Sequence, residues 1–332
     1  MSGCWRVLAM PEVCGFCPAT RSRISALLAG ILVGALLVSA PLAAKQLYHY
    51  VDENGIRHFT DVPPQTDQPV HSERVRTEPL PLFRVDSRRL DDGSSVLAVA
   101  NLTGGPVQVE LCLTEADNVR TTPALPARFV LEARQQRDLV TVSVDDPYRD
   151  ASYRVEASAV PGDPRTTPEP ANYLLPLASG TRYAISQAFG GSFSHTDEQN
   201  YHAVDLGVAD GTPVLAARDG VVVQVERDFY EGGTDRESLA ARANYIRVMH
   251  PDGTMAVYAH LAFESVRVRP GEIVLAGQHI GDAGATGFAT GPHLHFVIQR
   301  NAGMRLESIP FRFDGPDGAW QPRPSRSWQR AP

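Results

Sequence analysis

Short runs in which apolar and polar residues alternate recur along the chain and predict β-strands rather than helices. Residues 95–101 and 139–144 are two such runs, and turn signals at Gly104-Gly105 and Asp145-Asp146-Pro147 follow them. Alternation with a period of two places one face of a strand in a core and the other in solvent. The spacing predicts a small β-sandwich over residues 81–160, with a role as spacer or docking domain.

A similar pattern of short apolar runs recurs over residues 173–313. Short apolar runs punctuated by glycine occur there, for example at 213–217, 220–225 and 244–249, and helical periodicity is confined to about 236–243. We therefore predict a mainly β fold, with an antiparallel C-terminal domain after the sandwich. The segment 232–243, rich in glycine and charge, is an insertion between strands; we interpret it as a solvated loop that could frame a groove.

A third β unit is predicted near the start of the chain. Asn54-Gly55 joins two short runs within residues 45–64 and is the strongest short signal for a β-hairpin. Residues 47–64 resemble a short bacterial envelope-protein domain of unknown function, with an Asp-Glu-x-Gly turn, Phe-Thr-Asp and Pro-Pro. This resemblance implies a place in the cell envelope and no particular activity.

Proline-rich polar stretches divide these units. We predict linkers at residues 65–80 and 161–172, and a disordered tail at 314–332, which is rich in Pro, Gly and Arg.

Residues 1–44 have the order of a secretory signal. Arg21 and Arg23 precede an apolar stretch at 26–38, which small residues at 39–44 follow. We predict cleavage between Ala40 and Ala44 and export to the periplasm or cell envelope. The alternative is an uncleaved membrane anchor, but the apolar core of 13 residues is short against the roughly 20 that span a bilayer.

Composition narrows the function classes. The chain has 31 basic and 38 acidic residues, a net charge of −7, and loss of residues 1–44 would leave 28 basic against 37 acidic. This balance argues against nucleic acid as a partner. Cys4, Cys14 and Cys17 precede the predicted cleavage site, so Cys112 would stand alone without a disulfide partner. Glycine-rich runs similar to biotinyl and lipoyl carriers also occur, but Lys45 is the only lysine and leaves no residue to modify.

Candidate chemistry gathers in the C-terminal domain. His293 and His295 are two residues apart, so on a strand they share a face while Leu294 points to the other. Two imidazoles on one face suit two metal ligands, or one ligand and one acid–base group. Asp205 lies among apolar residues, where a carboxylate is costly unless it is paired or bound to metal. With His260 at another strand end, the cluster favours zinc.

Residues 173–313 resemble a lysostaphin-type, LytM-like zinc metallopeptidase domain, a family that cuts the peptide cross-bridges of bacterial peptidoglycan. The matching motifs in chain order are Phe189-Gly190, Ser194-His195, Ala203-Val204-Asp205, Gly211-Thr212-Pro213-Val214, Gly220-Val221-Val222, Tyr258-Ala259-His260-Leu261, Gly271-x-x-Val274-x-x-Gly277, Gly284-x-Thr286-Gly287 and Gly291-Pro292-His293-Leu294-His295-Phe296. The resemblance implies a zinc cofactor with Asp205 and His295 as ligands, and His260 and His293 as the catalytic pair. It implies an antiparallel β-sheet or barrel-sandwich fold for this domain.

The first zinc ligand departs from the family pattern. That ligand usually lies four residues before the aspartate, where this chain has Tyr201. His202 lies three residues before Asp205, an odd separation that would direct it to the opposite strand face. His195 lies ten residues before Asp205, on a preceding loop, and a subset of the family is similar in carrying Ser-His with a longer insertion. We favour His195 as the ligand, with His202 as the alternative.

The resemblance implies a zinc-dependent endopeptidase in which activated water hydrolyses peptidoglycan cross-links, of the diaminopimelate type if the envelope module indicates a Gram-negative source. One alternative is a non-catalytic LytM-like protein that activates an amidase by binding it, although such relatives lack ligands or catalytic histidines. Another is an adhesion or scaffold protein that binds peptidoglycan peptides. Residues 45–160 are the expected docking region for an envelope partner.

Overall fold

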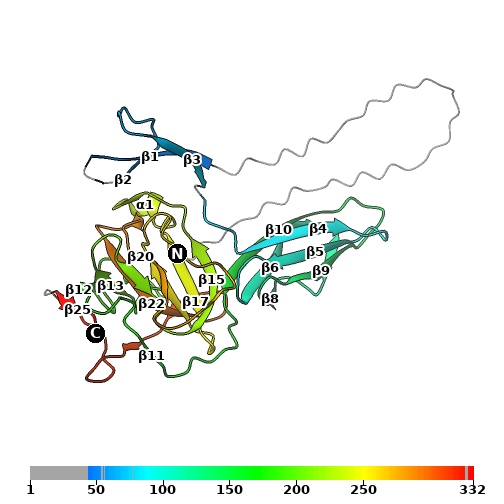
Figure 1. The fold of residues 1–332 in the computed structure, drawn as a ribbon. Coiled ribbons are helices and arrows are strands. Elements are labelled where there is room, and N and C mark those ends of the chain that lie inside the picture. Colours follow the sequence, from blue (N-terminus) through cyan, green and yellow to red (C-terminus); the bar gives the residue numbers. More distant parts are fainter. Residues whose placement is uncertain (1–43, 54, 56, 77, 326–327) are drawn as a thin grey trace.

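The computed structural model describes residues 44–53, 55, 57–76, 78–325 and 328–332 (Figure 1). The predicted signal segment therefore lies outside the described residues, except for Ala44, as do Cys4, Cys14 and Cys17. Within the described ranges, no helix is long and apolar enough to cross a membrane.

The N-terminal module is a three-stranded antiparallel sheet. Its strands are β1 (Ala44–Val51), β2 (Arg57–Thr60) and β3 (His71–Arg76), in the order β2-β1-β3. The hairpin β1–β2 is present as predicted, but β3 lies in the stretch predicted as a linker. Its sequence is polar and carries no alternation, and it forms a strand because the free edge of β1 offers backbone groups to pair with. His49 and His71 lie opposite each other there, with ring centroids 5.3 Å apart.

The predicted β-sandwich is confirmed as two sheets that enclose one core. One sheet has the order β4-β5-β9-β7 and the other β10-β6-β8. Their bounds are β4 Phe83–Arg89, β5 Ser95–Asn101, β6 Val107–Asp117, β7 Val119–Thr122, β8 Ala127–Leu131, β9 Gln136–Val144 and β10 Ser152–Pro161. Leu97, Val109 and Leu131 are fully buried between the sheets. Cys112 is half-buried on β6, and its Sγ donates to the carbonyl of Glu156 at 3.6 Å.

The C-terminal domain is built on a larger sheet, and its mainly β architecture is as predicted. The order is β19-β15-β17-β18-β22-β13-β12-β25, with β23 paired to β22. The bounds are β12 Arg182–Gln187, β13 Val204–Gly207, β15 Gly220–Glu226, β17 Tyr245–Met249, β18 Met255–Ala259, β19 Ile273–Val274, β22 His293–Asn301, β23 Leu306–Ser308 and β25 Gln329–Arg330. One face of the sheet carries the core, including the fully buried Ile246, Tyr258 and Phe296. The opposite face forms the floor of a groove.

Short paired segments complete this domain. They are β11 (Asn172–Tyr173) with β24 (Arg312–Phe313), β14 (Pro213–Leu215) with β20 (His279–Asp282), and β16 (Gly232–Gly233) with β21 (Gly287–Phe288). The single-turn helix α1 (Arg236–Leu239) is the only helix in the described part of the chain. It lies in the predicted insertion, next to the groove.

The disordered tail predicted at 314–332 is wrong for its described residues. Trp320 packs on Phe313 with ring centroids 5.2 Å apart, β25 pairs with β12, and Ala331 is buried. These residues order because the domain offers an apolar surface and an unpaired strand edge, which the local composition of the tail does not reveal.

The sandwich contacts the large sheet of the C-terminal domain through its loop at 102–106. The amide of Gly104 donates to the carbonyl of Val223 at 2.9 Å, and a Cβ at Gly104 would lie 2.2 Å from the nitrogen of Gly271. The amide of Met304 also donates to Oε1 of Gln108 at 2.8 Å. The sandwich and the C-terminal domain are therefore in direct contact through backbone groups, and they lie side by side in Figure 1.

Candidate metal centre and groove

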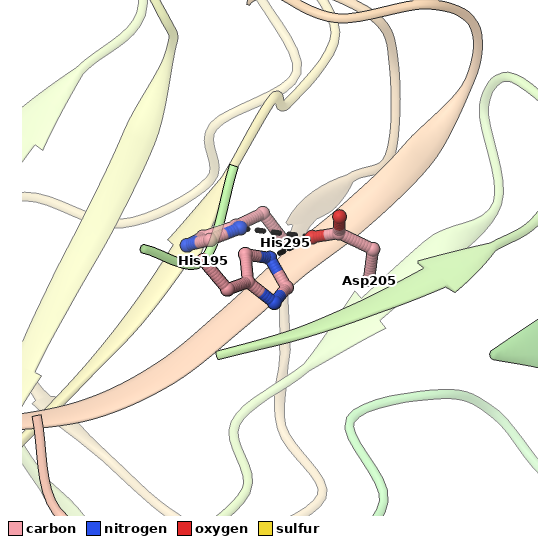
Figure 2. Close-up of side chains that lie close together, drawn as sticks. All are labelled: His195, Asp205 and His295. Carbon is pink, nitrogen blue, oxygen red and sulfur yellow. Dashed lines mark hydrogen bonds and ion pairs between the residues drawn. The ribbon is translucent and has the colours of Figure 1, made fainter. Parts of the chain in front are cut away.

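Three side chains converge at one end of the groove floor: His195, Asp205 and His295 (Figure 2). Asp205 on β13 lies directly opposite His295 on β22. Oδ1 of Asp205 is 3.1 Å from Nε2 of His195 and 2.9 Å from Nδ1 of His295. One donor atom from each residue lies within 4.8 Å of the others, so the three can surround one small cation.

The loop at 188–201 places His195. His195 is fully buried, and its Nδ1 lies 3.0 Å from the carbonyl of Ala188, so Nδ1–H donates and Nε2 faces Asp205. Gly190 turns the loop with a φ of +70°, which favours glycine, and its amide donates to the carbonyl of Tyr201 at 2.7 Å. The loop therefore returns to the sheet with its histidine directed inward.

His202, the alternative first ligand, does not approach Asp205. Its Nδ1 lies 2.9 Å from the carbonyl oxygen of Ser308, and its ring packs edge-on against Phe189. Tyr201, at the position of the usual family ligand, is half exposed. Only His195 of these three joins the cluster.

Asp205 is held in its charged form. Burial alone would raise its pKa, but hydrogen bonds and charge from His195 and His295 hold the pKa well below its usual range. Burial likewise disfavours a charged His195, yet its hydrogen bond to Asp205 raises the pKa of that imidazole. Nε2 of Gln187 donates to the second oxygen of Asp205 at 2.7 Å and to Ser194 at 2.9 Å. Sequence reasoning missed Gln187, although it pairs with Asp205 across β12 and β13.

Two further histidines lie beside the cluster. The ring centroids of His260 and His293 are 4.6 Å apart, and Nε2 of His293 lies 3.9 Å from Oδ1 of Asp205. Nδ1 of His260 lies 2.7 Å from the carbonyl of Thr286, and Nδ1 of His293 lies 2.9 Å from that of Gly291. Each Nδ1–H therefore donates to backbone and leaves Nε2 available. Burial lowers the pKa of His260 to about 3, and it also lowers the pKa of His293.

The groove has a volume of about 1170 Å³. One wall is an aromatic stack in which Phe193 and Phe288 lie 5.5 Å apart, and the guanidinium of Arg236 lies 4.4 Å over Phe288. Arg236 also donates to the carbonyl of Phe193 at 3.1 Å. Because Arg236 and Glu237 line the groove, the insertion at 232–243 contributes a wall and is more than a solvated loop.

The residues fit a zinc ion. Two imidazole nitrogens and one carboxylate oxygen form a donor set that zinc prefers, and three protein ligands leave a coordination position open. His195 is fully buried, whereas Asp205 and His295 line the groove, so the cluster is open to the groove on that side. Gln187 and the carbonyl of Ala188 act as outer partners that orient the ligands.

Residues 199–306 match the family described as Peptidase family M23, and residues 34–82 match a domain of unknown function, DUF4124. The chain is 36% identical over 98 residues to the peptidoglycan DD-endopeptidase ShyA of Vibrio cholerae, covering 30% of this chain and 20% of ShyA. It is 38% identical over 104 residues to the glycyl-glycine endopeptidase ALE-1 of Staphylococcus capitis, covering 31% of this chain and 25% of ALE-1. The chain thus spans about a quarter or less of the length of these relatives. Among solved structures, the catalytic domain of lysostaphin from Staphylococcus simulans is 26% identical, with a TM-score of 0.26, over 43% of this chain and 89% of that one.

Proposed function

Because the chain carries a domain of peptidase family M23, we propose that the protein is a zinc-dependent endopeptidase that hydrolyses the peptide cross-links of bacterial peptidoglycan. The observation that carries the proposal is the convergence of His195, Asp205 and His295 beside two further histidines at the floor of a groove. Similarity to relatives named as peptidoglycan and glycyl-glycine endopeptidases supports the substrate class.

His195, Asp205 and His295 would hold the metal. A zinc ion bound there would supply a Lewis acid and lower the pKa of a water molecule toward neutrality. Asp205 is ionised, and Nε2 of His195 could bind the metal once it gives up the proton it shares with Asp205, while Nδ1–H keeps its bond to the carbonyl of Ala188.

His260 and His293 are the proposed proton-transfer groups. The carbonyls of Thr286 and Gly291 fix their tautomers, so that Nε2 of each ring is free to accept and one of the two rings takes the single proton that the attacking water loses. Burial keeps the imidazole of His260 neutral near pH 7, so its Nε2 can accept a hydrogen bond from the water. The protonated ring then returns the proton to the leaving amine. The groove meanwhile orients an extended peptide between the aromatic wall and the metal centre.

Digestion of purified sacculi tests the proposal. The full chain should release cross-link-cleaved peptides, detected by mass spectrometry, and a chelator should abolish release. His293→Ala should reduce release by about 100-fold or more, since it removes an acid–base group but no metal ligand. His279→Ala is the matched control, because His279 pairs with Asp282 outside the groove, and it should release peptides as the unaltered chain does.

Release that persists in chelator would contradict zinc dependence. Full release by His293→Ala would contradict the assigned proton transfer. A chain that binds zinc and releases nothing, yet stimulates an added amidase, would favour the non-catalytic activator.

We further propose that the protein acts in the periplasm or cell envelope. The substrate class, the signal-like order of residues 1–44 and the match to the envelope-type module at 34–82 support this location. Cell fractionation with an antibody against the sandwich would test it, and recovery in the cytoplasmic fraction would contradict it.

A further inference from the structure

Arg247 is a buried cation in the floor of the groove, away from the metal centre. It is on β17, faces the groove together with Tyr245, and is only 8% exposed. Its neighbours Ile246 and Val248 point into the core on the other side of the sheet. A strand position that is buried to this extent is normally occupied by an apolar residue.

The charge of Arg247 is not balanced within the described structure. Nη1 donates to Oε1 of Gln299 at 2.6 Å, Nε is buried without an acceptor, and no described carboxylate lies within 4 Å of the guanidinium. Burial lowers the pKa of Arg247, but a guanidinium remains protonated in proteins. By contrast, the partly buried Arg218 pairs with Asp252 at 3.0 Å. An unpaired buried cation is costly to folding, and one that lines a groove is a candidate for binding an anionic partner.

The guanidinium is held in place before any partner arrives. Gln299 is itself buried, and its Nε2 donates to the carbonyl of Gln199 at 2.7 Å, which fixes Oε1 toward Arg247. Cζ of Arg247 also lies 6.0 Å from the centroid of the Tyr245 ring. A planar fork of donors positioned in this way suits a carboxylate.

The distance to the metal centre matches a peptide substrate. Arg247 pairs with Val257 and Val257 with Val297, which is two residues along β22 from His295. Two strand spacings and two residues of rise separate Arg247 from His295 by roughly 12 Å. Four extended residues span about 13 Å. A peptide cut at the metal centre would therefore reach Arg247 within a few residues.

We propose that Arg247, oriented by Gln299, binds a carboxylate of the peptide substrate a few residues from the bond that is cut. This inference rests on the proposed function and adds to it that the enzyme selects acidic peptides. Arg247 is thus a specificity-determining residue, whereas a purely structural role would leave substrate selection unchanged.

A binding experiment tests the inference apart from catalysis. Cross-linked muropeptides are prepared in native form and with their carboxylates converted to amides, and both are titrated calorimetrically into the full chain carrying His293→Ala to prevent turnover. The native form should bind about 10–100-fold more tightly, as expected for a charge-assisted hydrogen bond. Adding Arg247→Met should weaken binding of the native form and bring the two affinities within about threefold, whereas Arg247→Lys should retain part of the preference.

Controls separate the possible outcomes. Arg267→Met changes an exposed arginine outside the groove and should keep the full preference. Circular dichroism checks that each variant is folded, and Arg247→Lys serves if Arg247→Met is not. Equal binding of both muropeptides by the starting protein, no binding of either, or an unchanged preference in Arg247→Met would overturn the inference. Failure to digest sacculi, with this preference intact, would instead contradict the proposed hydrolysis.

Discussion

Asp205 is the residue to which the other groups of the candidate metal centre are tied. One of its oxygens meets His195 and His295, and the other accepts from Gln187. The strand β13 supplies the aspartate, β22 supplies one histidine and a loop supplies the other. Each element must therefore be in place before the three donor atoms can lie together.

The choice between His195 and His202 can be tested by metal binding. His195→Ala should lower zinc affinity by more than about 100-fold, because loss of an outer partner alone costs 10–100-fold. His202→Ala is the matched control and should bind zinc as the unaltered chain does, since His202 contacts Ser308 instead. Competition calorimetry with a chelator measures both. Loss of zinc in His202→Ala with retention in His195→Ala would reverse the assignment.

His260 adopts a backbone conformation that side chains other than glycine rarely take. Its φ is +62°, a left-handed value that costs a residue with a Cβ about 1 kcal/mol. His260→Gly should therefore be more stable to urea than His260→Ala by about 1 kcal/mol, although both lack the imidazole. Equal free energies of unfolding for the two variants would show that this backbone carries no strain.

Sequence reasoning at the residue scale succeeded where a strand fixes the spacing. Alternation along β22 predicted that Leu294 enters the core and that His293 and His295 share the other face. Alternation alone did not select His195, which was favoured on the family resemblance, because the path of a loop depends on contacts such as Gly190 with Tyr201 that no periodicity encodes. Nor could it find Arg247, since a lone charge in a strand gives no sign of its burial or of its missing partner.

At the scale of elements, the turn between β17 and β18 contains a buried histidine. Nδ1 of His250 donates to the carbonyl of Asp219 at 2.8 Å, and its Nε2 is buried without a partner. Tyr173 packs on its ring, and Arg218, Asp252 and Asp219 are the charged groups that face it. Burial lowers the pKa of His250 to about 4, so the folded protein keeps this ring neutral.

This histidine makes stability depend on pH. Below pH 6.5, His250 binds a proton in the unfolded chain but not in the folded protein. The free energy of unfolding therefore decreases as the pH falls from 6.5 toward 4, by about 3 kcal/mol in total. His250→Gln should show a smaller loss over this range in urea denaturation at each pH. His71→Gln, which changes an exposed histidine on β3, should follow the unaltered chain. An unchanged pH dependence in His250→Gln would contradict the assignment.

The strands that sequence reasoning missed share one cause. β3 and β25 carry few apolar residues, and each forms because a neighbouring strand, β1 or β12, has a free edge. Strands that carry their own apolar residues, such as β5, which is buried almost throughout, and β22, which alternates at its start, were visible because burial requires apolar side chains. Edge pairing leaves no such record in the sequence.

At the scale of the whole molecule, the sandwich and the C-terminal domain depend on a close approach at Gly104. A methyl group there would lie 2.4 Å from the carbonyl oxygen of Val222 and closer still to Gly271. Gly104→Ala should therefore separate the two units without lowering zinc affinity. Faster exchange of the residue 104 amide, which donates to the carbonyl of Val223, with metal binding unchanged, is the expected result. Unaltered exchange would mean that the loop at 102–106 can shift without breaking the contact.

The pairing of β25 with β12 has a consequence for the behaviour of the protein in a crowded compartment. β12 would otherwise present unpaired backbone groups beside the buried Tyr183 at the margin of the large sheet, and such margins recruit strands from other molecules. The last described residues occupy that margin, and Ala331 anchors them in the core. The polar strand β25 thereby covers the edge of β12 and protects the sheet from edge-to-edge aggregation.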